Sequence, residues 1–199
     1  MLPSWDPDTL RKVVPFVIGC VGARRTGKST AISHLLFQMC EQFDLVICFI
    51  GSAACNPTIE AMMKKYWDPR FFFSEWNTKL VECLLQQQED AGPLKRNILI
   101  LVDDVVLTGK DEDQLSHLAM RGRHFGISLM MCAVSYTSLP KKARRSLDAL
   151  LVFSQGLSPN ARFAVRCRRK KLPDTFNSSS RSWPTAAVGR RRYERATPP

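Results

Sequence analysis

Five short runs along the chain are almost entirely apolar, and polar segments with helical spacing separate them. The runs are 16–21 (FVIGCV), 44–50 (DLVICFI), 97–102 (NILILV), 127–134 (ISLMMCAV) and 149–153 (ALLVF). A strand that is apolar along its whole length is buried on both faces, which is typical of a parallel sheet covered by helices. The pattern therefore predicts an α/β fold with a mostly parallel, five-stranded sheet and helices on both faces.

The segments between these runs predict the helices. They are 28–42, 56–66, 74–88, 111–123 and a short basic helix at 141–146. The second of them opens with Asn56 as a cap and Pro57 at the first helical position. Phe71–Phe73 can form a further short strand, and together with Trp67 and Trp76 it offers either a core cluster or a base-stacking face.

A phosphate-binding motif follows the first predicted strand and opens the first predicted helix. Gly22–Ser29 (GARRTGKS) fits GxxxxGK[ST], whose glycines let backbone N–H groups face inward as an anion nest at a helix N-terminus. Lys28 would reach the β- and γ-phosphates of a nucleoside triphosphate such as ATP, and the Ser29 hydroxyl would coordinate Mg²⁺. The predicted nucleotide-binding residues are Gly22, Ala23, Arg24, Arg25, Thr26, Gly27, Lys28, Ser29 and Thr30.

Two acids, Asp103 and Asp104, follow the third predicted strand, 97–102, at the edge of the sheet where the phosphate loop also lies. We expect Asp103 to hold Mg²⁺, mostly through water. Asp104 would polarise the attacking water, or alternatively cap the following turn. The 74 positions between Ser29 and Asp103 leave room for an intervening strand, as the helicase and motor branch of P-loop proteins requires. No Asn-Lys-x-Asp guanine signature is present, which disfavours a GTPase.

Further catalytic candidates lie on both sides of the fourth predicted strand. Ser135, at its tip, is placed either as a polar sensor of the γ-phosphate or as an ordinary strand-end serine. One arginine would act as a finger in a neighbouring subunit's site, against the simpler interpretation of solvated surface residues. The arginines concerned are Arg121, Arg123, Arg144 and Arg145. The three histidines and seven cysteines have no metal-binding spacing.

The net charge of +11 is concentrated near the C-terminus, where residues 160–199 carry eleven Lys and Arg against two acids. This divides the chain into an ATPase domain, 1–155, and a basic extension, 156–199, which we expect to be largely disordered beyond 170. The extension either contacts nucleic acid or is merely solvated. Because no secretory signal and no membrane-length apolar run is found, we expect an intracellular, soluble protein without a membrane partner.

Four stretches resemble the DNA-packaging ATPases of large double-stranded DNA viruses, the poxvirus-type branch of the FtsK–HerA superfamily. They are GARRTGKST (22–30), FDLVICF (43–49), ILILVDD (98–104) and the block 121–153, in which an Arg/His-rich turn leads to the sensor strand and then to a Leu-Pro and a basic segment. The family usually carries Gln at or beside Ser135. The resemblance implies a RecA-like P-loop NTPase core, homo-oligomeric rings and ATP-driven, sequence-independent translocation of duplex DNA. It also implies capsid or portal partners, at sites of virus assembly in the host cytoplasm or nucleus.

Two other functions are compatible with a P-loop. One is a nucleotide or nucleoside kinase, although the acidic patch 111–113 and the short connection 136–145 do not resemble an acceptor pocket with an Arg-rich lid. The other is a nucleotide-gated DNA-binding protein without turnover, against which the intact Lys28, Ser29 and acid pair argue.

Overall fold

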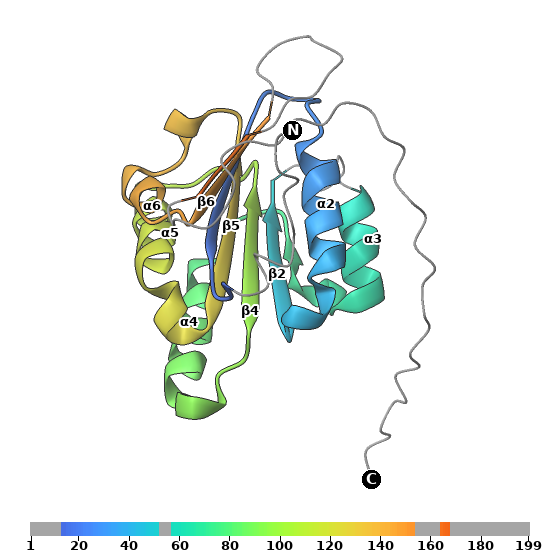
Figure 1. The fold of residues 1–199 in the computed structure, drawn as a ribbon. Helices are drawn as coiled ribbons and strands as arrows, with labels where there is room; N and C mark the ends of the chain where they lie inside the picture. The colour runs from blue at the N-terminus through green and yellow to red at the C-terminus, as the bar shows by residue number, and fades with distance from the viewer. Residues whose placement is uncertain (1–12, 52–56, 154–163, 168–199) are drawn as a thin grey trace.

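Seven strands form one sheet in the computed structural model, which describes residues 13–51, 57–153 and 164–167. The strand order is β3-β2-β4-β5-β1-β6-β7 (Figure 1). The strands are β1 (Val17–Val21), β2 (Leu45–Ile50), β3 (Phe72–Phe73), β4 (Ile98–Asp103), β5 (Ile127–Ala133), β6 (Ala149–Val152) and β7 (Ala164–Cys167). Every neighbouring pair is parallel except β6 and β7.

The predicted fold class is confirmed, and the strand count of five is low by the two edge strands. The five apolar runs are β1, β2, β4, β5 and β6, because central strands covered on both faces must be apolar throughout. The edge strand β3 has only two residues, and β7 lies within the basic extension, where the sequence offers no apolar run. The expectation of disorder beyond 170 falls outside the described residues.

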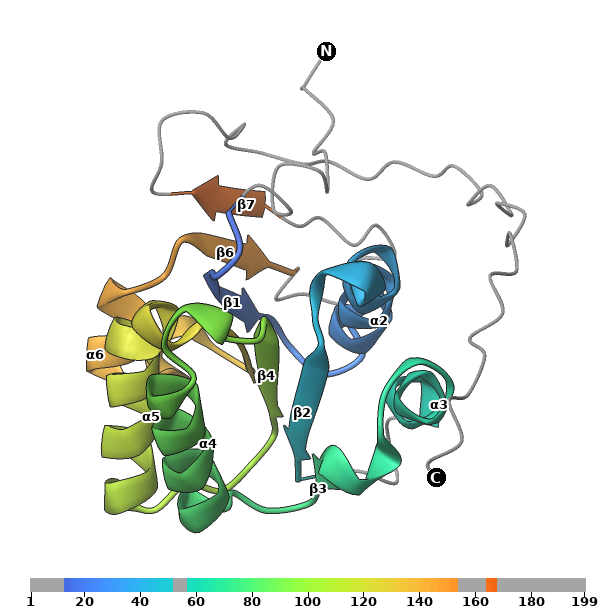
Figure 2. The same cartoon turned by 90° about the horizontal axis from the view of Figure 1, so that it is seen from below.

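Helices cover both faces of the sheet, as Figures 1 and 2 show. They are α2 (Lys28–Gln38), α3 (Pro57–Tyr66), α4 (Thr78–Asp90), α5 (Gly109–Arg121) and α6 (Lys141–Arg145). Alternate residues of β4 divide between the two cores, with Leu99 and Leu101 in the core under α2 and α3. Ile98, Ile100 and Val102 belong to the core under α4, α5 and α6. The alternation of side chains along a strand therefore supplies both cores at once.

The two helix boundaries that differ most from the prediction do so for local reasons. α2 ends at Gln38 rather than at 42, because the chain tightens into the 3₁₀ turn η1 (Cys40–Gln42). α4 begins at Thr78 rather than at 74, because the Asn77 side chain accepts the Leu80 N–H at 3.0 Å and caps the helix there. Four more 3₁₀ turns are η3 (Pro69–Phe71), η4 (Gly92–Leu94), η5 (Gly122–Phe125) and η6 (Tyr136–Ser138).

The aromatic stretch belongs to the cores rather than to a base-stacking face. Trp67 packs against the core under α2 and α3, and its indole N–H donates to the Phe43 carbonyl at 3.4 Å. Trp76 packs against the other core, with its ring centroid 4.7 Å from that of Phe49. Its indole N–H donates to Gln114 at 2.8 Å, so the polar end of this ring is also satisfied within the protein.

A carboxylate ties the start of α5 to α4. Asp111 accepts hydrogen bonds from the Thr108 hydroxyl at 2.6 Å and the Thr108 N–H at 3.0 Å, forming a capping box. It also accepts one from the Thr78 hydroxyl at 2.8 Å. The side-chain hydrogen bond from Thr108, followed by its backbone N–H and by Thr78, holds the pKa of Asp111 below its ordinary value of 3.8.

Asp111→Ala is expected to lower the free energy of unfolding at pH 7 by about 1 kcal/mol, the usual contribution of such a cap. Because the folded-state pKa is lowered, this contribution is complete above the unfolded-state pKa and disappears as pH falls through the folded-state pKa. The difference from wild type should therefore shrink as the pH falls below the ordinary pKa value of 3.8, in urea unfolding curves recorded from pH 7 downwards. Glu112→Ala, which removes an exposed acid of the same helical turn, is the control. An equal loss in both variants would contradict a specific cap.

Candidate nucleotide site

The phosphate loop and the acid pair meet at one edge of the sheet. Both follow the carboxyl ends of parallel strands, β1 and β4, and β5 lies between these strands. In the register, Asp103 is beside Cys132 of β5, which is in turn beside Cys20 of β1. The chain between Ser29 and Asp103 contains β2 and β3, as expected, whereas β5, which separates β4 from β1 in the sheet, follows Asp103 in the chain.

The loop between β1 and α2 is held in its curl by backbone geometry and short contacts. Arg25 and Gly27 both have positive φ, 62° and 88°, and the Thr26 hydroxyl donates to the Ala23 carbonyl at 2.8 Å. Gly22 is packed so closely that a Cβ there would lie 2.6 Å from the Cβ of Phe153. These residues leave backbone N–H groups of the loop free to turn inward at the start of α2.

Lys28 lies within this loop rather than out in solvent. Its Nζ donates to the Gly22 carbonyl at 2.6 Å and to the Ala23 carbonyl at 2.8 Å. The ammonium is thus fixed over the loop and lines the adjoining cavity. A cation so placed would neutralise the charge of a bound phosphate chain.

A cavity of ≈ 720 Å³ opens between the loop and the acid pair, a size typical of small-ligand sites. Its lining consists of Arg24, Arg25, Gly27, Lys28, Ser29, Thr30, Asp103, Asp104, Cys132, Ala133 and Val134. Asp103 is buried, with 9% of its surface exposed. Asp104 is exposed, with φ 53°, and its carboxylate makes no hydrogen bond within the described part of the chain. The cavity thus combines cations and N–H groups on one wall with carboxylates on the other.

Ser29 and Asp103 offer oxygen atoms to the cavity, which is the donor type that suits Mg²⁺, and these two residues would hold the ion. Among the described residues, no three His, Cys, Asp or Glu side chains come together as a metal site. A divalent cation here would therefore rely on Ser29, Asp103, phosphate oxygens and water, which is how Mg²⁺ is usually held.

Cys132 forms part of the cavity floor as a neutral group. A hydrogen bond with Cys20 raises the pKa of its thiol well above the ordinary value, and burial and the nearby Asp103 act in the same direction. The thiol therefore stays protonated at neutral pH and adds no negative charge beside Asp103.

Ser135 is not among the residues that line the cavity, and neither are Gly22, Ala23 and Thr26 of the phosphate loop. The Ser135 hydroxyl lies 2.9 Å from that of Thr137 and 2.8 Å from that of Ser138. This hydroxyl cluster begins directly after Val134, a cavity residue that follows the end of β5 at Ala133. The Ser135 hydroxyl thus has hydrogen-bonding neighbours of its own outside the cavity lining.

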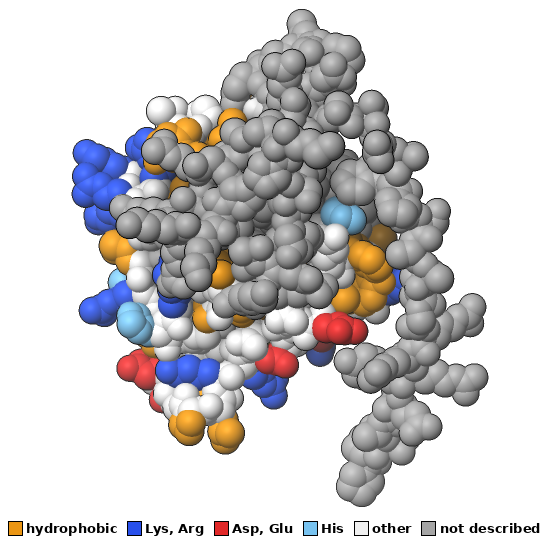
Figure 3. All heavy atoms as spheres, viewed as in Figure 1, with side chains coloured by type: hydrophobic (Ala, Val, Ile, Leu, Met, Phe, Trp, Pro, Cys, Tyr) orange, Lys and Arg blue, Asp and Glu red, His pale blue; other side chains and the backbone are white. Residues whose placement is uncertain are grey.

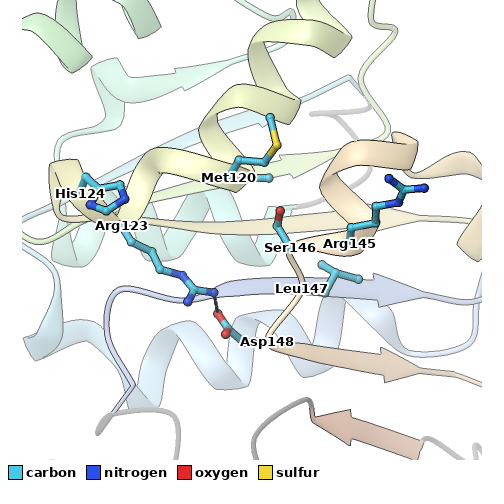
Figure 4. Close-up of a pocket in the computed structure, with 8 residues that line it drawn as sticks. Met120, Arg123, His124, Arg145, Ser146, Leu147 and Asp148 are labelled. Atoms are coloured by element: carbon cyan, nitrogen blue, oxygen red, sulfur yellow. Dashed lines mark hydrogen bonds and ion pairs between the residues drawn. The ribbon is translucent and has the colours of Figure 1, made fainter.

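The candidate arginines occupy three different settings. Arg123 pairs with Asp148 at 2.5 Å, beside a hollow of ≈ 700 Å³ between η5 and the end of α6 (Figure 4). Both residues precede the amino ends of their strands, so this hollow lies at the opposite edge of the sheet from the nucleotide cavity. Arg121 is exposed at the end of α5. Arg144 lies over the ring of Tyr136, with 5.1 Å between Cζ and the ring centroid.

Figure 4 shows the guanidinium of Arg123 directed at Asp148, whereas Arg145 points away from that pair. Figure 3 shows Lys and Arg side chains gathered on the side of the molecule formed by α5 and α6. The exposed members of this group include Arg121, Lys141, Lys142 and Arg145.

None of the helices in the described residues is both long and apolar enough to cross a membrane.

Comparisons with solved structures identify the fold. EssC (ATPases 2 and 3) from Geobacillus thermodenitrificans is 17% identical, with TM-score 0.57, over 82% of this chain and 40% of that one. The type VII secretion ATPase EccC of Thermomonospora curvata is 15% identical, with TM-score 0.59, over 83% of this chain and 24% of that one. The genome packaging NTPase B204 of Sulfolobus turreted icosahedral virus 2, in complex with AMP, is 13% identical, with TM-score 0.52, over 81% of this chain and 98% of that one.

The fold is that of the RecA-like P-loop ATPases. The chain spans well under half of the EssC and EccC chains but nearly the whole of B204. No protein-family profile and no curated protein sequence matches the chain, so the similarity lies in the backbone and not in extended sequence identity.

Proposed function

We propose that this protein is an ATP-hydrolysing motor that moves duplex DNA without reading its sequence, in packaging a viral genome. The observation that carries the proposal is the pairing of phosphate loop and acid pair at one cavity, with β5 between their strands. This arrangement is the one that P-loop motors require. The likeness to B204, a genome packaging NTPase covered over 98% of its length, supports the packaging role. The poxvirus-type branch is suggested by the four sequence stretches alone.

The residues of the cavity divide the work of hydrolysis. Backbone N–H groups of the loop and Lys28 bind and orient the β- and γ-phosphates. Ser29 and Asp103 would hold Mg²⁺, which neutralises charge on the phosphates when it is bound. The exposed carboxylate of Asp104 is free to orient a water for in-line attack on the γ-phosphate. Ser135 could assist only after its hydroxyl leaves Thr137 and Ser138.

In a ring of subunits, a neighbouring subunit would supply a further positive charge to the triphosphate, in the form of an arginine finger. Because Arg121 and Arg123 lie at the opposite edge of the sheet from the protein's own cavity, either could meet a triphosphate only in another subunit. Of the two, we propose Arg121 as the finger, since it is exposed while Arg123 is held by Asp148. Capsid or portal proteins would then receive the ring during virus assembly.

Substitution of Arg121 and substitution of Arg123 should have different effects on stability and activity. Arg123→Ala is expected to lower the free energy of unfolding by about 1–2 kcal/mol, because Asp148, with 12% of its side chain exposed, would lose its cationic partner and keep the Val17 N–H at 2.8 Å. Arg121→Ala should leave stability unchanged and reduce kcat on the order of 10³-fold. Urea unfolding and steady-state hydrolysis measure both quantities. A stable but inactive Arg123→Ala protein would reverse the assignment.

The test of the function is ATP hydrolysis by the full chain with and without long duplex DNA. A motor should hydrolyse ATP faster on DNA, with stimulation that weakens as salt rises. Asp104→Asn is the companion variant, expected to bind the nucleotide and to lose turnover. Hydrolysis that ignores DNA but rises with a small phosphate acceptor would instead indicate a kinase. Nucleotide binding without turnover in the wild type would indicate a gated binding protein.

A further inference from the structure

Arg144 has a setting that a finger residue does not need. Its guanidinium carbon lies 5.1 Å from the ring centroid of Tyr136, within the range of a cation–π contact. The Nε atom is buried and has no hydrogen-bond acceptor within the part of the chain that the structure describes. The side chain is thus committed to the face of a ring in its own subunit, eight positions back along the chain. A flat guanidinium is suited to such stacking, which an ammonium would reproduce poorly.

The ring belongs to the segment that leaves the nucleotide cavity. Val134 lines the cavity, and the chain then turns through η6 and enters α6 at Lys141. Two backbone hydrogen bonds close the turn, from Ser138 N–H to the Ser135 carbonyl at 3.2 Å and from Leu139 N–H to the Tyr136 carbonyl at 3.3 Å. Tyr136 itself remains 44% exposed, so its ring is not buried in either core.

Both ends of this segment are anchored in the sheet. At its start, the Ala133 carbonyl accepts the N–H of Gly22, the first residue of the phosphate loop, at 3.2 Å. At its end, Leu139 is buried and packs against Gly19 of β1, where a Cβ would lie 3.2 Å from the leucine Cδ1. Between these anchors Tyr136, Thr137 and Ser138 are exposed, and this is the portion that a further contact can hold.

We propose that Arg144 acts in its own subunit as a positioning residue that clamps Tyr136, and with it the turn carrying Val134 and Ser135, against the nucleotide cavity. This inference rests on the proposed hydrolysis of ATP. It removes Arg144 from the candidate fingers, because the guanidinium that would reach a neighbour's phosphate already stacks on Tyr136. This contact also connects α6 with the cavity, because the chain from Ala133 at the cavity to Arg144 in α6 contains both the clamped ring and the turn.

The clamp is tested first by amide hydrogen exchange, which does not depend on hydrolysis. Arg144→Ala and Tyr136→Ala should each speed exchange of the Ser138 and Leu139 amides, and the double variant should exchange no faster than either. Tyr136→Phe, which keeps the ring, should exchange nearly as slowly as wild type, whereas Arg144→Lys should not restore protection. Lys141→Ala, an exposed cation of the same helix, is the control. Unchanged exchange in both alanine variants would overturn the proposal, whether or not the protein hydrolyses ATP.

Hydrolysis then distinguishes a clamp in one subunit from a finger between subunits. Arg144→Ala and Tyr136→Ala should each lower kcat about twofold to fivefold, the fold-change that a cation–π contact supports, with equal effects. Mixing Arg144→Ala with Lys28→Ala subunits should restore nothing, because the defect stays in the subunit whose phosphate loop is intact. If the mixture regains activity, or if only the arginine variant is impaired, Arg144 acts on a neighbour and the proposal fails.

Discussion

Lys28→Ala is expected to reduce kcat for ATP hydrolysis by 10²–10³-fold, on the order of the effect of removing one preorganised donor from a charged transition state. The reason is the position of Nζ, fixed by the Gly22 and Ala23 carbonyls at 2.6 and 2.8 Å, on the wall of the cavity. Charge on the transferred phosphoryl group is spread over its oxygens in the transition state, and a cation fixed beside them stabilises that charge. Water that enters in place of the lysine is not held in this position, so it does not replace the lost stabilisation.

Stability should respond far less than rate. Lys28 is half-buried, and within the described residues its ammonium bonds to its own loop alone, so its removal should change the free energy of unfolding by less than about 1 kcal/mol. Lys64→Ala is the control, because Lys64 is exposed on α3 and pairs with Glu60 at 2.7 Å; it should hydrolyse ATP at the wild-type rate. Full activity in the folded Lys28→Ala protein would remove the phosphate loop from the proposed mechanism.

Gly51→Ala is expected to disrupt both the fold and the site. A Cβ at this position would lie 2.0 Å from the Asp104 carbonyl oxygen and 2.9 Å from its carbon, and these are backbone atoms that cannot rotate away. The Gly51 N–H also donates to the Asp103 carbonyl at 3.0 Å. We expect a loss of about 1–3 kcal/mol in the free energy of unfolding, as for other overpacked positions. Displacement of the acid pair should lower hydrolysis as well.

Gly109→Ala is the matched control for this substitution. Gly109 is the first residue of α5, and nothing lies within 4 Å of the position of its added Cβ. Alanine there should be neutral or stabilise by less than about 1 kcal/mol, because it restricts the unfolded chain and favours the helix. Thermal unfolding of the two variants beside wild type gives the comparison. Equal unfolding temperatures would mean that the approach of Gly51 to Asp104 does not constrain the acid pair.

The sequence alone determined the features that consist of residues consecutive in the chain. The phosphate loop is a single run of residues, 22–29, and its strand and helix context can be read on either side. The five central strands are visible because burial on both faces requires apolar residues at every position. The acid pair at 103 and 104 follows from the same pattern, since it ends one of these runs. Each feature depends on the spacing of residues that are close together in the chain, and this spacing can be read directly from the sequence.

The tertiary structure decided how distant residues meet. Arg123 and Asp148 are 25 positions apart, and nothing in either segment marks them as partners until η5 and the end of α6 lie side by side. Gly51 and Asp104 approach because β2 and β4 are neighbours in register, with Ile50 beside Asp103. The roles open to the four arginines therefore could not be distinguished from sequence. The sequence shows that these residues are arginines, but the role of a guanidinium depends on the groups that lie near it in the folded chain. Those neighbours follow from strand order and register, which are set by the packing of the whole sheet.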